Sequence, residues 1–142
     1  MPGRFPVAVH VFFLRGDEIL LLRRLNTGYE DGKLGVVAGH VKPGETVTRA
    51  AIRESREEIG LEPAGDRIRV VGVMHRKSND ERIDFFLSCA LGDEEPRNVE
   101  AEKCSELAWA KRSALPDDTI PYVRAALENF RGGRWFEEFG WE

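Results

Sequence analysis

A 23-residue segment, residues 39–61, constrains this chain more than any other part of its sequence. It reads GHVKPGETVTRAAIRESREEIGL, in which a Pro-Gly turn precedes a stretch that predicts a helix ending near Gly60. On that helix Glu54, Glu57 and Glu58 are separated by three and four residues, so their carboxylates project from one face. Three like charges therefore crowd one surface, close to the helix end where the dipole already disfavours negative charge.

This carboxylate cluster predicts a bound cation. Hard divalent cations take oxygen ligands, and Mg²⁺ commonly shares its coordination with water and substrate phosphates. The alternative is a solvated helix face on which arginines pair with the acids, which is the commoner explanation of a Glu-rich helix. The fixed spacing of seven residues argues against it, because at about 5–10% usage per residue type it arises by chance in fewer than about one chain in a million. Those seven residues are Gly39, Glu45, Arg53, Glu54, Glu57, Glu58 and Gly60.

The spacing resembles the Nudix box, Gly-x5-Glu-x7-Arg-Glu-U-x-Glu-Glu-x-Gly-U, where U is a bulky aliphatic residue. Every position of fixed residue type is matched, and flanking features resemble small MutT-like Nudix hydrolases over nearly the whole chain. One departure is Ser55 at the first U position. We expect its hydroxyl to bond the carbonyl four residues earlier, and the lost apolar contact to cost about 1–3 kcal/mol. A second is the stretch LGVVAG before the box, which lacks the Trp and Pro common in relatives.

The rest of the chain predicts further strands and a second helix. Apolar runs bounded by turn residues predict strands over 7–14, 18–24, 67–75, 82–90 and 107–110, and helical spacing predicts a helix from Pro121 to about Gly132. The fold class is α/β, and the resemblance implies the Nudix α/β/α sandwich with a mixed β-sheet between helices. With 142 residues, 42% of them hydrophobic, and no linker, we expect a single domain over residues 1–142.

Charge and cysteine content limit the partners that we expect. A net charge of −4 argues against polymeric nucleic acid and against a membrane surface, since either would need a basic face. The apolar stretch near the N-terminus is too short to span a bilayer. Cys89 and Cys104 have no metal-like spacing and are expected as reduced thiols, which predicts a cytoplasmic location. A homodimer is expected because related proteins commonly form one. The aromatic C-terminal segment RWFEEFGWE is expected to pack on a partner subunit or on the core of its own chain.

The resemblance implies roles for the box residues. Glu54, Glu57 and Glu58 are expected to ligate Mg²⁺ or Mn²⁺, with the carbonyl oxygen of Gly39 as a backbone ligand. Either Glu54 or Glu57 is expected to be the general base for a water whose pKa the metal lowers. Arg53 is expected to pair with the first box glutamate and hold the loop over the metal.

Residues outside the box are predicted with alternatives. Many relatives recruit one more metal-binding glutamate from a late loop. Among the glutamates of 92–103 we select Glu100, the alternative being a solvated acidic loop; the other candidates are Glu94, Glu95 and Glu102. Arg24, with its neighbour Arg23, lies where MutT-like enzymes contact substrate phosphate, the alternative being strand-end solubility.

Base recognition is the part that the motif does not fix. Asn98 is a candidate to hydrogen-bond a base edge, and Trp109 or Phe86 to stack on its ring. The alternative for Trp109 is a place in the core. No role is predicted for His10 or His40.

Nudix subclasses with different substrates carry characteristic residues after the box, and these can indicate the substrate class. None appears here: neither the Pro of ADP-ribose enzymes, nor the Tyr of dinucleoside polyphosphate enzymes, nor the SQPWPFPxS signature of NADH enzymes. We therefore expect Mg²⁺-dependent hydrolysis of a nucleoside diphosphate linked to another moiety, with a (deoxy)nucleoside triphosphate as substrate and monophosphate and pyrophosphate as products.

Three alternatives stay open. They are a pyrophosphatase for ADP-ribose or other nucleotide sugars, a non-catalytic nucleotide sensor, and an isomerase of prenyl diphosphates. A sensor often loses box glutamates, which this chain keeps, and function lies in the site rather than the fold. The isomerase would want an extra catalytic cysteine, whereas Cys89 on an apolar strand is better explained as core.

Overall fold

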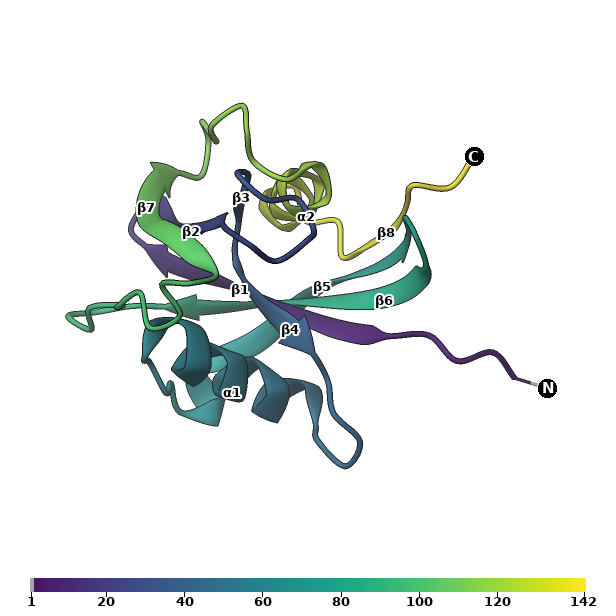
Figure 1. Ribbon diagram of the computed structural model, residues 1–142, viewed down its shortest axis with the longest axis horizontal. Helices are drawn as coiled ribbons and strands as arrows, with labels where there is room; N and C mark the ends of the chain where they lie inside the picture. Colours follow the sequence, from purple (N-terminus) through teal and green to yellow (C-terminus); the bar gives the residue numbers. More distant parts are fainter. Residues whose placement is uncertain (1) are drawn as a thin grey trace.

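The computed structural model describes residues 2–142 and shows a mixed β-sheet between two helices (Figure 1). The helices are α1 (Val47–Ile59) and α2 (Pro121–Arg131), and they cover opposite faces of the sheet. The strands are β1 (Val7–Arg15), β2 (Glu18–Arg24), β3 (Leu34–Gly35), β4 (Val37–His40), β5 (Ile68–Lys77), β6 (Glu81–Ala90), β7 (Cys104–Lys111) and β8 (Phe136–Phe139). The predicted α/β/α sandwich is confirmed.

The sheet divides where β1 and β2 separate. These strands pair only at Leu14–Ile19 and Arg15–Glu18, next to their turn. Beyond that point β4 pairs with β1, whereas β3 and β7 pair with β2. Strand β1 continues the sheet by pairing in parallel with β6, which pairs antiparallel with β5. The division leaves room between β2 and β4 for the cleft that carries the box glutamates.

Helix α1 has clear start and stop signals. The Thr46 side chain accepts a hydrogen bond from the Arg49 amide at 3.1 Å, and Gly60 ends the helix in the left-handed conformation at φ 72°. Ser55 is fully buried, and its hydroxyl donates to the carbonyl of Ala51 at 2.7 Å, as predicted. The helix is therefore fixed in register, which sets the direction of its glutamates.

Two apolar clusters fill the space on either side of the sheet. Val9, Val11 and Phe13 of β1 face α1, whereas Phe12 packs in the cluster beneath α2. Strand alternation thus assigns each side chain of β1 to one layer, and the position of a residue on this strand decides which helix it meets.

A polar network is buried within the α2 layer. Asp84 is fully buried, and its carboxylate accepts a hydrogen bond from Arg76 Nε at 2.7 Å and lies 2.9 Å from His10 Nε2. The guanidinium of Arg76 stacks over the Tyr122 ring at 3.7 Å. Burial alone raises the pKa of Asp84, but the contacts with His10 and Arg76 outweigh it and lower that pKa to about 2.

This network predicts an acid-sensitive stability. Because the pKa of Asp84 in the fold lies below its ordinary 3.8, the ionised carboxylate stabilises the protein above about pH 4, by about 2 kcal/mol, and this contribution is lost as the pH falls toward 2. Urea unfolding between pH 7 and pH 3 should show the loss. Asp84→Asn should make that slope shallower and cost about 3–5 kcal/mol at pH 7, because Arg76 keeps a buried charge without its partner. The exposed control Asp93→Asn should keep the slope of the unmodified protein; an unchanged slope in Asp84→Asn would contradict the assignment.

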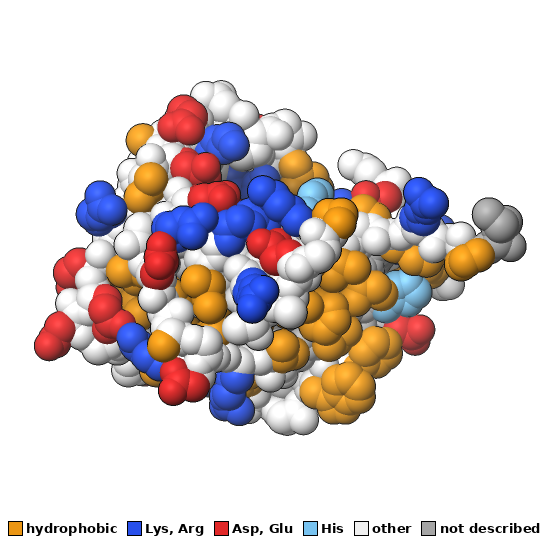
Figure 2. All heavy atoms as spheres, turned by 90° about the horizontal axis from the view of Figure 1, so that it is seen from below, with side chains coloured by type: hydrophobic (Ala, Val, Ile, Leu, Met, Phe, Trp, Pro, Cys, Tyr) orange, Lys and Arg blue, Asp and Glu red, His pale blue; other side chains and the backbone are white. Residues whose placement is uncertain are grey.

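The aromatic tail forms an edge strand that the sequence analysis did not predict. Strand β8 pairs in parallel with β5, with Phe136 opposite Val73. The Trp141 ring lies tilted against the His75 ring, with centroids 4.8 Å apart, while Trp135 stays 69% exposed. Seen from the side of α1, charged side chains of both signs alternate over one half of the molecule and hydrophobic side chains gather in the other (Figure 2). The homodimer stays a prediction.

Neither helix within residues 2–142 has the length and apolarity needed to cross a membrane.

Candidate active site

A cleft of about 430 Å³ lies between the end of α1, strand β2 and the loop before β7. Its wall combines carboxylates with basic side chains. The carboxylates are Glu54, Glu57, Glu58 and Glu100, and the basic side chains are Arg23, Arg24 and Lys103. The structure therefore brings together the three box glutamates of α1, the selected loop glutamate and both predicted arginines.

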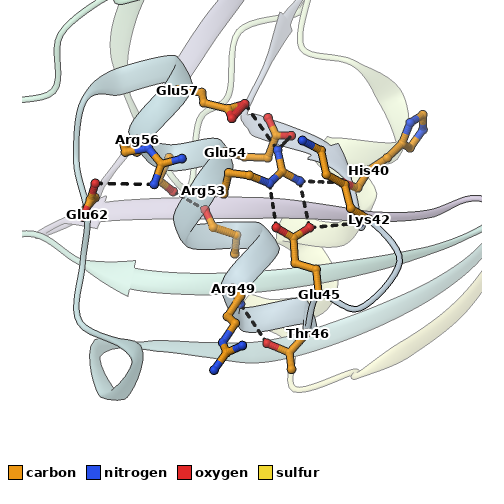
Figure 3. A network of polar contacts seen from close by, with 12 residues as sticks. His40, Lys42, Glu45, Thr46, Arg49, Arg53, Glu54, Arg56, Glu57 and Glu62 are labelled. Carbon is orange, nitrogen blue, oxygen red and sulfur yellow. Dashed lines mark hydrogen bonds and ion pairs between the residues drawn. The ribbon is translucent and has the colours of Figure 1, made fainter.

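Arg53 organises the acidic wall (Figure 3). Its Nε donates to Glu45 at 2.7 Å and its Nη2 donates to the same carboxylate at 3.0 Å and to the carbonyl of His40 at 2.9 Å. This two-pronged pair, expected from the sequence, holds the pKa of Glu45 at about 2 through its hydrogen bonds. The remaining nitrogen, Nη1, donates to Glu54 at 2.7 Å and to Glu57 at 3.4 Å. One guanidinium thus fixes the turn before α1 and orients two carboxylates of the cleft.

The deeper carboxylates carry an electrostatic penalty. Burial, and then the neighbouring carboxyl of Glu54, raise the pKa of Glu58 well above its ordinary value, although the Ala38 amide donates to it at 3.4 Å. Burial also raises the pKa of Glu100, against the opposing effect of Lys103. Grouped carboxylates whose charged forms are disfavoured are the setting in which a cation is most stabilising.

The residues present fit a divalent cation. The donors are carboxylate oxygens, which hard cations prefer, and at Gly39 a Cβ would overlap the Glu54 carboxyl group, so glycine lets this side chain approach the backbone of β4. Within residues 2–142, no group of three His, Cys, Asp or Glu side chains is arranged so that it could coordinate one metal ion as it stands. Glu54 and Glu57 instead pair with Arg53 Nη1, at 2.7 Å and 3.4 Å.

The two predicted phosphate contacts have partners of their own. Arg23 donates to Glu106 at 2.8 Å and to Asp118 at 2.7 Å. Arg24 donates through Nε to the Tyr29 carbonyl at 2.7 Å and through Nη2 to a threonine hydroxyl at 3.0 Å, and its Nη1 makes no hydrogen bond within the described chain. Arg23 likewise makes its hydrogen bonds through Nε and Nη1, so within residues 2–142 each arginine keeps one nitrogen, Nη2 of Arg23 and Nη1 of Arg24, without a hydrogen bond.

The three candidates for base recognition do not line this cleft. Asn98 donates to the carbonyl of Cys104 at 2.8 Å, which anchors the loop before β7. Trp109 packs against the core on the α1 side, with the guanidinium of Arg15 at 4.7 Å above its ring. Phe86 is only 2% exposed. Their assignment to a base stays a prediction.

Sequence reasoning missed three polar residues that line the cleft: Asn26, Thr27 and Lys103. Lys103 follows Glu100 by three residues in the same loop, a spacing that could have drawn attention to it. The other two lie in the 26–33 loop, where Asp31 accepts hydrogen bonds from the Thr27 amide at 3.0 Å and from its hydroxyl at 2.6 Å. Turn residues alone gave no sign that this loop reaches the cleft.

Comparison with known proteins decides the family. The family model described as NUDIX domain matches residues 4–130. The chain belongs to the Nudix family. This Nudix chain is similar to a putative 8-oxo-dGTP diphosphatase of Bacillus subtilis, 30% identical over 118 residues that cover 82% of the chain and 73% of the relative. The crystal structure of a MutT NUDIX hydrolase from Burkholderia pseudomallei matches it with a TM-score of 0.80 at 27% identity, covering 89% of this chain and 98% of that one.

A second group of relatives is longer. The Nudix chain is 30% identical over 114 residues to an NAD-capped RNA hydrolase NudC of Pseudomonas aeruginosa, and the match covers 80% of the chain but 38% of that relative. It therefore spans well under half the length of these NudC proteins.

Proposed function

We propose that this Nudix chain is a divalent-metal-dependent pyrophosphohydrolase that cleaves a nucleoside or deoxynucleoside triphosphate into a monophosphate and pyrophosphate. One observation carries the proposal: four carboxylates and three basic side chains line the same cleft. The carboxylates suit a cation and the basic groups suit phosphate oxygens, so the two sets together match a metal-bound polyphosphate.

The box residues divide the work. Glu54, Glu57, Glu58, Glu100 and the Gly39 carbonyl would hold Mg²⁺ or Mn²⁺. When bound, the cation neutralises charge on the phosphate oxygens and lowers the pKa of a coordinated water. Arg53 positions the glutamates on either side of its Nη1 atom.

Of the two candidate bases we favour Glu57. Its side chain is 38% exposed and lies 3.4 Å from Arg53, whereas that of Glu54 is 14% exposed and held at 2.7 Å. The looser and more open carboxylate is better able to meet a water and accept its proton.

The phosphates would be met by the basic side of the cleft. Arg24 Nη1 and the Lys103 ammonium make no hydrogen bond within residues 2–142, and both groups line the cleft. Arg23, held between two carboxylates, supports the strand end and contributes its charge.

Relatives supply a second candidate substrate. The putative 8-oxo-dGTP diphosphatase, of which this chain covers 73%, favours an oxidised deoxynucleoside triphosphate within the same reaction class. Similarity to the NudC proteins favours NAD-linked substrates less, because the match leaves most of those proteins uncovered and the SQPWPFPxS signature is absent here.

The test is a substrate panel. Ordinary and 8-oxo nucleoside triphosphates, ADP-ribose, NADH and dinucleoside polyphosphates would be incubated with Mg²⁺ or Mn²⁺, and products separated by ion-exchange chromatography. We expect monophosphate and pyrophosphate from at least one triphosphate, with loss of turnover in EDTA. Release of orthophosphate instead, preference for ADP-ribose, or binding without turnover would each contradict the proposal.

A further inference from the structure

A second cavity, of about 380 Å³, adjoins the cleft on the α2 side of the sheet. Arg24 and Ala38 line both spaces, so the two are neighbours along β2 and β4. The wall of the second cavity includes His10, Tyr29 and Tyr122. A ligand whose phosphates lie in the cleft would reach this cavity with the rest of its structure.

Strand pairing explains why the cavity exists. In the antiparallel pair of β1 and β4, His10 lies opposite Ala38, and Ala8 lies opposite His40. Opposed residues share one face of a sheet, so two alanines flank the imidazole where larger side chains would fill the space. The small neighbours leave His10 at a cavity wall.

His10 is held rigidly from three sides. Its side chain is 3% exposed, and Nε2 lies 2.9 Å from Asp84, whose carboxylate is itself fixed by Arg76. The ring stacks on Phe86 with centroids 4.8 Å apart and meets the Tyr122 ring edge-on at 5.4 Å. Such support is typical of a side chain whose orientation matters.

One polar atom of this rigid ring has no partner. Nδ1 of His10 is buried and makes no hydrogen bond within the described residues. A buried polar atom without a partner costs free energy and is uncommon in folded proteins. Since His10 lines the cavity, a molecule bound there is the natural source of the missing bond.

The network also fixes which kind of partner fits. The low pKa of Asp84 keeps its carboxylate ionised at neutral pH, and an ionised carboxylate only accepts hydrogen bonds. Nε2 must then carry the hydrogen of their contact, and in the neutral ring Nδ1 is left as an acceptor. With a neutral ring, the cavity therefore presents an acceptor that calls for an N–H or amino donor.

We propose that His10 is a specificity-determining residue, and that its Nδ1 accepts a hydrogen bond from an N–H or amino group of the substrate's nucleobase in the second cavity. The inference rests on the proposed function for the placement of the phosphates. The new element is that the nucleobase is recognised on the α2 face of the sheet. The recognising group is the His10 imidazole, which the Asp84–Arg76 pair holds in one tautomer.

The first test observes His10 directly. Protein labelled with ¹⁵N-histidine would be titrated with AMP, GMP, CMP, UMP, nebularine 5′-monophosphate and ribose 5-phosphate. Nebularine is a purine base without N–H or amino groups, and ribose 5-phosphate has no base. We expect at least one of the four ordinary nucleotides to move the Nδ1 resonance of His10, and the last two probes to leave it in place. A signal unmoved by all four, or moved equally by nebularine monophosphate, would overturn the proposal.

The second test uses a variant that separates the two ring nitrogens. In His10→Gln the amide nitrogen lies near the former Nε2 and keeps a donor for Asp84, while the Nδ1 acceptor is removed. We expect about 10-fold weaker binding of the responsive nucleotide, with binding of ribose 5-phosphate unchanged. His75→Gln, in β5 and outside the cavity, should bind like the unmodified protein. Unchanged nucleotide affinity in a folded His10→Gln variant would also overturn the proposal.

These measurements need no turnover. A His10 response without triphosphate hydrolysis would therefore reject the proposed reaction alone, and hydrolysis with a silent His10 would reject the base assignment alone.

Discussion

Replacing Glu57 by glutamine is expected to lower turnover at least about 100-fold and to leave the fold intact. The carboxylate is 38% exposed and its ion pair with Arg53 is 3.4 Å long, so the fold depends little on its charge. Glutamine keeps the shape of the side chain but cannot accept the proton of an attacking water, and its amide is a poorer ligand for a hard cation. Initial rates with the best substrate of the panel, at saturating Mg²⁺, give the comparison.

The matched control is Glu62→Gln. Glu62 is 60% exposed just beyond α1, pairs with Arg56 at 3.7 Å and does not line the cleft, so its loss should change turnover less than about two-fold. Thermal unfolding of both variants would verify that each is folded. Full activity in Glu57→Gln would mean that neither the base nor the metal site lies where we propose.

The parts of the site that the sequence predicted are those that depend on local geometry. Helix periodicity alone places Glu54, Glu57 and Glu58 on one face, and Thr46 and Gly60 mark the start and end of that helix. The Ser55 back-bond follows from the same local geometry. These features need no knowledge of tertiary contacts, so the chain reveals them directly.

The parts that were missed depend on which strands become neighbours. His10 and Asp84 are 74 residues apart and meet because β1 and β6 pair in parallel, a pairing that no short pattern specifies. Arg76 lies between His75 and Lys77 near the end of β5, a polar context that gives no sign of burial, yet it is 2% exposed. Strand β8 was missed because four residues with two glutamates carry little strand signal until β5 offers an edge.

Loop residues form a third case. Glu100 was chosen among the four glutamates of one loop, and it is one of the residues that line the cleft. Asn98, two residues away, instead bonds the backbone of Cys104. Composition identifies a loop rich in polar side chains, but the hydrogen bonds that fix the loop decide which of them face the cleft.

Gly39→Ala is expected to separate activity from stability. The backbone at Gly39 does not have the positive φ that would exclude alanine, and the atoms nearest to the added Cβ belong to the Glu54 carboxyl group, the far end of a side chain that can rotate away. The fold should therefore be as stable as before, or more stable by about 0.4–1 kcal/mol because the unfolded chain loses freedom. The displaced Glu54 carboxylate, moved by about 1 Å or more, should cost about 100-fold in turnover.

The control for this substitution is Gly65→Ala, whose Cβ would meet only the Thr48 methyl group at an ordinary 3.9 Å. It should preserve both turnover and stability. Activity titrated against Mg²⁺ would show whether Gly39→Ala raises the metal concentration needed, as expected if Glu54 is a ligand. Unimpaired turnover of Gly39→Ala at low Mg²⁺ would contradict the requirement for glycine at position 39. It would mean that the displaced Glu54 carboxylate functions as well as the original one. A loss of stability that matched the loss of activity would point instead to packing between β4 and α1.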